Sequence, residues 1–244
     1  MTAVARTALR TSASIGVLAF WCGMWMADER YPSEYDWRYI TMSSLVYPDR
    51  NPRGYLWAWT GVALCALAGL YWTGVRLSQS RQAAGLAPPA GVRALAVGYL
   101  CMMCGGMLPG PLLRLPKLHE LLALSAFFGV GIGLVQSTLL MARQSVWLAT
   151  LPGKRQWYAV VLAAVAVSPV VLAALAQAYV SYARPELPWV SLAWRARGVP
   201  IYLSFAFWEW VACAVFSAYM LALCWVTVPR PPRLALPWHR SRSA

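Results

Sequence analysis

Long apolar stretches alternate along the chain with shorter segments rich in proline, glycine and charge. A helix needs about 20 mostly apolar residues to cross a bilayer. Six stretches approach or exceed this length: 11–27, 55–75, 92–109, 119–142, 157–181 and 201–228. They are continuously apolar and lack the alternation of a membrane β-barrel, so only a helix satisfies their backbone in lipid. The pattern predicts an all-α, polytopic transmembrane bundle of six spans that forms one domain over residues 1–244.

The composition agrees with this pattern. Hydrophobic residues make up 60% of the chain and charged residues 12%, about half the charged share of a soluble domain. An ordinary soluble enzyme and a disordered tail are therefore excluded. In the first stretch, Trp-Met-Ala precedes Asp28. This is not the small-x-small pattern of a signal-peptide cleavage site, so we expect the stretch to remain as a span.

All six cysteines lie inside apolar stretches, which is typical of small packing residues. Cys101 and Cys104 have the Cys-x-x-Cys spacing of half a metal site. No second pair and no nearby histidine accompany them. The sequence therefore predicts no metal and no cofactor.

The net charge is +13, and the distribution of the lysines and arginines along the chain predicts the orientation in the membrane. Twelve of the 21 lysines and arginines fall in segments on the same side as both termini, and none of the eight acidic residues does. Basic segments stay on the cytoplasmic side of a membrane, so we predict that both termini are inside. Because the basic residues are spread through short gaps, they do not form a face for nucleic acid. We expect a multi-pass protein of a cell membrane, the inner membrane of a bacterium.

The predicted outer segments are richer in aromatic and charged residues than the inner ones. Residues 28–54 form a loop of 27 residues, and a loop of this length is often functional. Its aromatic residues and alternating charges predict that it folds over the outer ends of the helices. Residues 182–200 predict a second segment at the interface between membrane and water.

Ionisable residues inside membrane spans are costly and are candidates for function. Glu209 lies eight residues after position 201, about 12 Å along a helix, and His119 begins the fourth span. Both belong to the predicted outer half of the membrane. His119 with the Glu209 carboxylate could act as a general base, and Ser43 as a nucleophile. A lipid headgroup would be bound by Asp36, Arg38, Ser44, Asp49, Arg50, Arg53, Arg114 and Glu120.

Each of these residues also has a purely structural interpretation. Glu209 could pair with an arginine to fix helix packing, and His119 could be a helix-start residue in the headgroup region. Ser43 and Ser44 could be turn or capping residues. In the fourth span, the Gly129-x-x-x-Gly133 spacing predicts close packing of helices.

Three functional hypotheses follow from these residues. The first is a protein with an outward-facing polar pocket that binds or handles a membrane lipid. The second is a lipid-modifying hydrolase or acyltransferase that uses His119 and a carboxylate. The third is a non-catalytic membrane scaffold whose outer loop binds a protein partner. Transport is a weaker fourth hypothesis, since only Ser168-Pro169 clearly interrupts a span.

The order of these features resembles the DRAM/Frag/Sfk family of six-span membrane proteins. Residues 38–45 (Arg-Tyr-Ile-Thr-Met-Ser-Ser-Leu) and 47–54 (Tyr-Pro-Asp-Arg-Asn-Pro-Arg-Gly) are similar to its first loop. Leu118-His119 and Glu209-Trp210 are similar to the family's histidine and Glu-Trp positions. The resemblance implies involvement with lipids, such as remodelling of lipid anchors or lipid distribution, without fixing an activity.

This chain also departs from the family's pattern. The loop serine Ser43 is followed by Ser44 and Leu45 where the family carries an acidic residue. The only histidines are His119 and His239, so one chain cannot form the three-histidine zinc site of related membrane hydrolases.

Overall fold

The computed structural model describes residues 3–84, 90–107, 118–144, 155–187 and 193–225. These parts of the chain are mainly helical and contain no β-strand, which confirms the all-α prediction. Six long helices make up most of the structure: α1 (Ala3–Asp28), α3 (Tyr55–Ala84), α4 (Ala90–Met107), α6 (Leu118–Gln144), α8 (Arg155–Ala183) and α10 (Phe205–Trp225). Three short elements lie in the connections: α2 (Ser43–Val46), α9 (Ala193–Ala196) and the 3-10 helix η1 (Ile201–Leu203).

Four of the long helices have the length and composition needed to cross a membrane. The qualifying segments are Tyr55–Ser78, Leu118–Leu139, Val160–Ala183 and Phe205–Trp225. In α4 the apolar part is shorter, Gly91–Gly105, and α1 is not among the four. The described structure is thus that of a helical protein with four segments suited to a bilayer.

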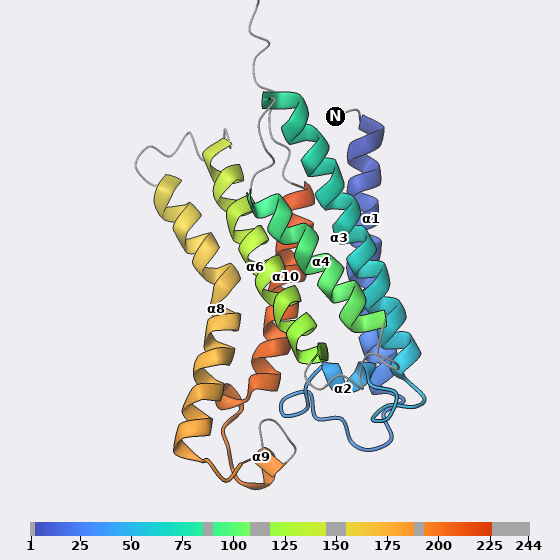
Figure 1. Cartoon of the computed structure of the whole chain (residues 1–244), viewed down its shortest axis with the longest axis vertical. Coiled ribbons are helices and arrows are strands. Elements are labelled where there is room, and N and C mark those ends of the chain that lie inside the picture. The colour runs from blue at the N-terminus through green and yellow to red at the C-terminus, as the bar shows by residue number, and fades with distance from the viewer. Residues whose placement is uncertain (1–2, 85–89, 108–117, 145–154, 188–192, 226–244) are drawn as a thin grey trace, which may run out of the picture.

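The long helices run alternately up and down in one bundle (Figure 1). Along the bundle α1 lies beside α3, α3 beside α4, α4 beside α6, and α6 beside α8, while α10 contacts α1, α6 and α8. The start of α1 and the end of α10 lie at the same end of the bundle (Figure 1). Residues 29–54 lie at the opposite end, which we call the loop end (Figure 1).

Glycines bring α4 and α6 into backbone contact. A Cβ atom on Gly129 would lie 2.7 Å from Gly98 Cα, and one on Gly133 would lie 2.8 Å from the carbonyl oxygen of Gly91. Real Cβ atoms do not come this close, so a side chain at either position would push the helices apart. The packing role predicted for Gly129 and Gly133 is confirmed.

The last long helix begins later than the sequence predicted. Residues 201–203 form η1, Ser204 is extended with ψ 124°, and α10 begins only at Phe205. The Trp208 indole nitrogen donates to the carbonyl of Tyr202 at 2.8 Å, an acceptor that a continuous helix would use within its own backbone. Glu209 therefore lies one turn, about 6 Å, into α10, and the expected 12 Å is wrong.

Candidate functional site

The segment between α1 and α3 is folded against the bundle. In α2, Leu45 is fully buried. Together with Met42 it packs in a cluster that includes Met24 of α1 and Val62 of α3. The indole of Trp59 donates to the carbonyl of Val46 at 2.9 Å. The loop thus covers the loop end of the helices, as its aromatic residues predicted.

Asn51 fixes the second half of this loop. Its side chain is fully buried and its amide donates to the carbonyls of Ala27, at 2.9 Å, and Leu45, at 3.3 Å. The amide oxygen accepts the backbone N–H of Gly54 at 3.0 Å. One side chain therefore links the end of α1, α2 and the approach to α3.

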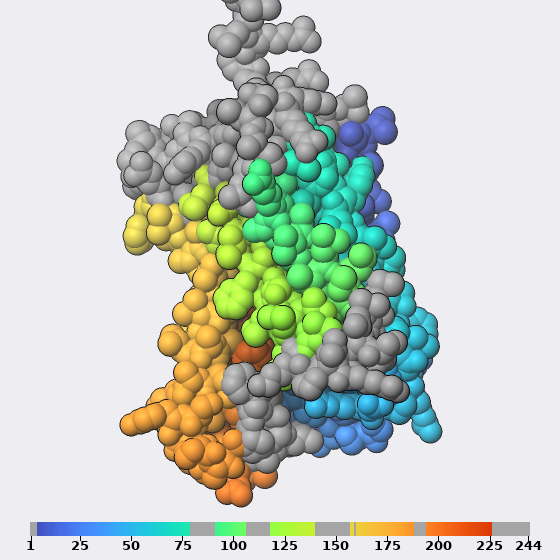
Figure 2. Space-filling model, viewed as in Figure 1, coloured from blue at the N-terminus to red at the C-terminus, as the bar shows by residue number. Residues whose placement is uncertain are grey.

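Beneath this loop a cavity enters the bundle. Its empty space is about 930 Å³ when the open solvent at its mouth is counted. Its walls come from α1, α3, α4, α6 and α10, and α2 with Met42 closes it at the loop end. Figure 2 also shows part of α10 in a hollow between α6 and α8, and this hollow differs from the described lining of the cavity, which includes no residue of α8. The lining residues are Val17, Phe20, Met24, Met42, Ser43, Val46, Val62, Cys65, Tyr99, Cys101, Met102, Gly105, His119, Ala123, Ala126, Phe127, Val130, Glu209, Cys213, Phe216, Ser217 and Met220.

All three residues predicted as catalytic candidates line this one cavity: Ser43, His119 and Glu209. They come from α2, α6 and α10, which are far apart in the sequence. The structure thus brings them together, although their chemical roles stay predictions.

The Glu209 carboxylate is held by backbone. Glu209 is 8% exposed, and its Oε2 atom accepts a hydrogen bond from the backbone N–H of Met42 at 2.8 Å. The described residues form ion pairs at Asp36 and Glu34 only, with Arg38 and Arg195 as partners. Within the described parts of the chain, no arginine or lysine therefore neutralises Glu209.

The His119 ring is fixed on one side and free on the other. It stacks edge-on against Tyr47 with ring centroids 4.8 Å apart. Its Nε2 atom is buried without a hydrogen-bond partner among the described residues. Since buried polar atoms nearly always have a partner, this nitrogen offers an unused hydrogen-bonding position.

The Ser43 hydroxyl is not engaged by the histidine. Its Oγ is hydrogen-bonded to Thr41 Oγ1 at 2.9 Å, while His119 Nε2 has no such partner. An activated serine needs a base within hydrogen-bond reach. The described geometry therefore forms a polar cavity wall without a nucleophile–base contact.

Of the residues predicted to bind a headgroup, those that the structure describes lie outside this cavity. None of Asp36, Arg38, Ser44, Asp49, Arg50, Arg53 and Glu120 lines it, and Arg114 lies outside the described residues. Arg50 donates to Ser44 Oγ at 3.0 Å on the far side of α2. Asp49, Arg53 and Glu120 are exposed. The structure therefore does not collect Arg38, Arg50 and Arg53 into one phosphate pocket with His119 and Glu209.

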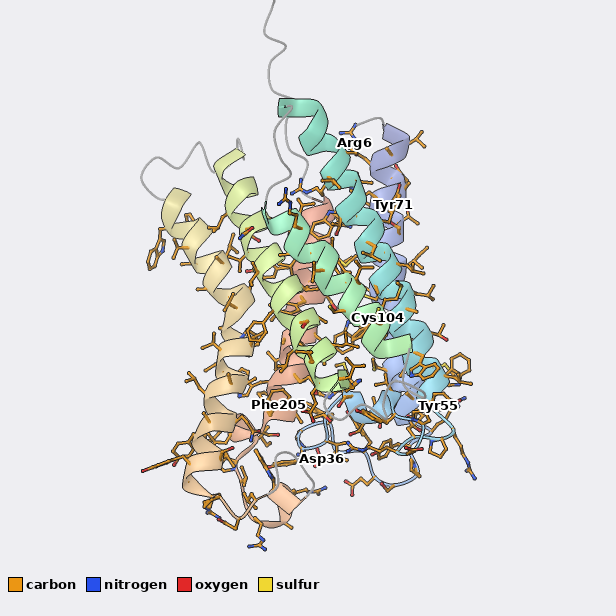
Figure 3. The ribbon with its side chains drawn as sticks, in the orientation of Figure 1. Arg6, Asp36, Tyr55, Tyr71, Cys104 and Phe205 are labelled. Atoms are coloured by element: carbon orange, nitrogen blue, oxygen red, sulfur yellow. The ribbon has the colours of Figure 1, made fainter. Side chains whose placement is uncertain are left out.

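Asp36 instead joins two connections at the loop end, where Figure 3 labels it near Phe205. Its buried carboxylate accepts from Arg38 Nε at 2.7 Å and lies 3.3 Å from Arg195 Nη1. Nearby, the Tyr39 hydroxyl donates to the carbonyl of Val199 at 2.7 Å. Burial raises the pKa of Asp36, but the hydrogen bonds and charge of Arg38 outweigh it and hold that pKa below its ordinary value.

This depressed pKa gives a prediction for acid conditions. The contribution of Asp36 to stability is complete above the ordinary aspartate pKa, about 4, and is lost as the pH falls through the lower folded value. Asp36→Asn is expected to lower the unfolding temperature by a constant amount between pH 7 and pH 5. The difference from wild type should close at lower pH. An equal difference at all pH values would contradict the assignment.

Sequence reasoning missed Asn51 and the backbone N–H of Met42. Asn51 precedes Gly54 in a Pro-containing turn, and asparagine side chains commonly bond the backbone in such turns. That signal was available in the sequence. The N–H of Met42 has no signal, because every residue except proline carries one.

The described residues hold no group of three or more His, Cys, Asp or Glu side chains placed to bind a metal ion. Comparison of the chain with protein-family models, curated proteins and solved structures finds no match. The class of the protein therefore rests on its own fold: a helical protein with apolar segments suited to a membrane.

Proposed function

We propose that the chain crosses a cell membrane six times, through α1, α3, α4, α6, α8 and α10, and binds a membrane lipid in the cavity. The helices α1 and α4 have 26 and 18 residues, about 39 and 27 Å, against a hydrocarbon core of about 30 Å. An even number of spans places both termini on the same side of the membrane. This agrees with the bundle, in which the start of α1 and the end of α10 lie at the same end. Figure 3 labels Arg6 at the end of the bundle opposite the loop. The twelve lysines and arginines of the predicted inner segments support placing that end inside.

The observation that carries the proposal is the division of the cavity into two parts. At the loop end lie Ser43, His119 and Glu209. Along α10 the lining continues from Glu209 to Met220, about 16 Å at 1.5 Å per residue, and this deep part is largely apolar. A polar end and an apolar deeper part match the two parts of a lipid.

Two alternatives are less well supported by the same contacts. A hydrolase or acyltransferase would need Ser43 in hydrogen-bond reach of His119, and Ser43 bonds Thr41 instead. A pure scaffold would have Glu209 sealed by an arginine, whereas its carboxylate lines the cavity and accepts a backbone N–H. Lipid binding requires neither a contact between Ser43 and His119 nor an arginine partner for Glu209.

We also propose that the chain is a member of the DRAM/Frag/Sfk family. Its support is local: the Glu-Trp pair, Glu209 and Trp210, meets the outer loop through Met42 N–H and through Tyr35, whose hydroxyl lies 3.3 Å from Trp210 Nε1. The first loop and the last helix, which carry the resemblance, thus contact each other. The bacterial inner membrane is the location that we propose from the basic inner segments.

Native mass spectrometry of the purified full chain tests the proposal. We expect the wild type to retain a lipid and His119→Ala and Glu209→Gln each to retain less. Glu120→Gln is a matched control, because Glu120 adjoins His119 but is exposed and lies outside the cavity. An identical lipid profile in wild type, His119→Ala and Glu209→Gln would overturn the proposal.

A further inference from the structure

The polar end of the cavity is equipped to accept hydrogen bonds. Glu209 contributes a carboxylate whose Oε2 already takes the N–H of Met42, and its second oxygen has room for another donor. His119 contributes Nε2, which has no partner among the described residues. In a neutral imidazole one ring nitrogen donates and the other accepts, so Nε2 can serve as an acceptor.

Positive charge is absent from the described lining of the cavity. No lysine or arginine belongs to it. In the loop, Arg38 is paired with Asp36, and Arg50 donates to Ser44 and lies over the Tyr47 ring. A phosphate placed beside Glu209 would bring a second negative charge against a lining whose described residues include no cation, and this is unfavourable.

We propose that the lipid bound in this cavity carries a free hydroxyl as its head, as in a long-chain alcohol or a diacylglycerol, and no phosphate; this rests on the lipid-binding function proposed above. The hydroxyl of the lipid donates a hydrogen bond to Glu209 or to His119 Nε2, and it accepts one from the hydroxyl of Ser43. A hydroxyl both donates and accepts, so it matches this set of groups without adding charge. The hydrocarbon chain lies along Phe127, Phe216 and Met220.

Three probes with one chain and different heads test the ligand class: oleyl alcohol, oleyl phosphate and oleylamine. Each is titrated into the full-length wild type, and binding is measured by native mass spectrometry. We expect oleyl alcohol to bind at least about tenfold more tightly than oleyl phosphate, the ratio that 1.4 kcal/mol produces. We expect the alcohol also to bind more tightly than the amine.

A variant that adds a cation tests the reason for this preference. Ala123 lines the cavity one turn after His119, so Ala123→Arg is expected to reduce or reverse the ratio of alcohol to phosphate binding. Leu124→Arg, on the exposed side of α6, should leave the ratio unchanged.

The outcomes separate the two proposals. Tightest binding of oleyl phosphate or of oleylamine by the wild type overturns the hydroxyl inference and leaves lipid binding intact. Failure of all three probes to bind, together with no retained native lipid, overturns the lipid-binding function itself. If Ala123→Arg does not fold, the wild-type ratio alone decides.

Discussion

Replacing Ala126 with tryptophan is expected to reduce the retained lipid at least about tenfold. Ala126 is buried on α6 and lines the middle of the cavity. An indole at this position would project into the space that we assign to the hydrocarbon chain. Filling that space removes the contacts that drive burial of the chain, and each lost methylene costs about 0.8 kcal/mol, so two or three account for the change. Lipid content per protein, measured after purification, reports the effect.

A neighbouring position supplies the control for this experiment. Leu124 also lies on α6 but is 49% exposed and does not line the cavity. Leu124→Trp adds a similar side chain to the outer face of the same helix, so its lipid content should equal that of wild type. An equal loss of lipid in both variants would show that a tryptophan anywhere on α6 disturbs lipid retention. This result would contradict the cavity as the binding site.

The substitution Asn51→Ala is expected to give the largest loss of stability, about 3 kcal/mol. It removes three hydrogen bonds and leaves the carbonyls of Ala27 and Leu45 without this donor. A buried group that loses its partner costs about 1–3 kcal/mol. Thermal or chemical unfolding in detergent, followed by tryptophan fluorescence, measures the change.

Asp49→Ala is the matched control, since Asp49 lies in the same loop and is exposed. Its unfolding should differ little from that of wild type. Should Asn51→Ala unfold like Asp49→Ala, Asn51 would not be the link between α1, α2 and α3. The lipid content of Asn51→Ala is a second readout, because Met42 and Ser43 of the same loop close the cavity.

The sequence predicted the helices and the three cavity residues for physical reasons. Continuous apolar stretches leave few choices of backbone structure, so the helical nature of the chain followed directly. Polar groups such as His119 and Glu209 are costly in lipid. Helices that carry such groups turn them toward one another, and the structure places both on the same cavity with Ser43.

The arrangement of the arginines could not be predicted in the same way. Arg38 bonds Asp36 only two residues away, and Arg195 reaches the same carboxylate from the connection before α10. Local pairing of this kind competes with a shared phosphate site, and the number of charges in a loop does not say which pairs form. The start of α10 was also missed, because residues 201–203 are as apolar as the helix that follows and Ser204, where the chain is extended, gives no stronger signal.

The most direct test of the central claim is photocrosslinking from two adjacent positions. Phe127 lines the cavity, whereas Phe128 is 54% exposed on the outer surface of α6. Benzoylphenylalanine at position 127 is expected to crosslink one lipid class in cell membranes. The same group at position 128 should crosslink the mixture of lipids that surrounds the protein. The same mixture at both positions, or no lipid at position 127, would contradict a lipid site in the cavity.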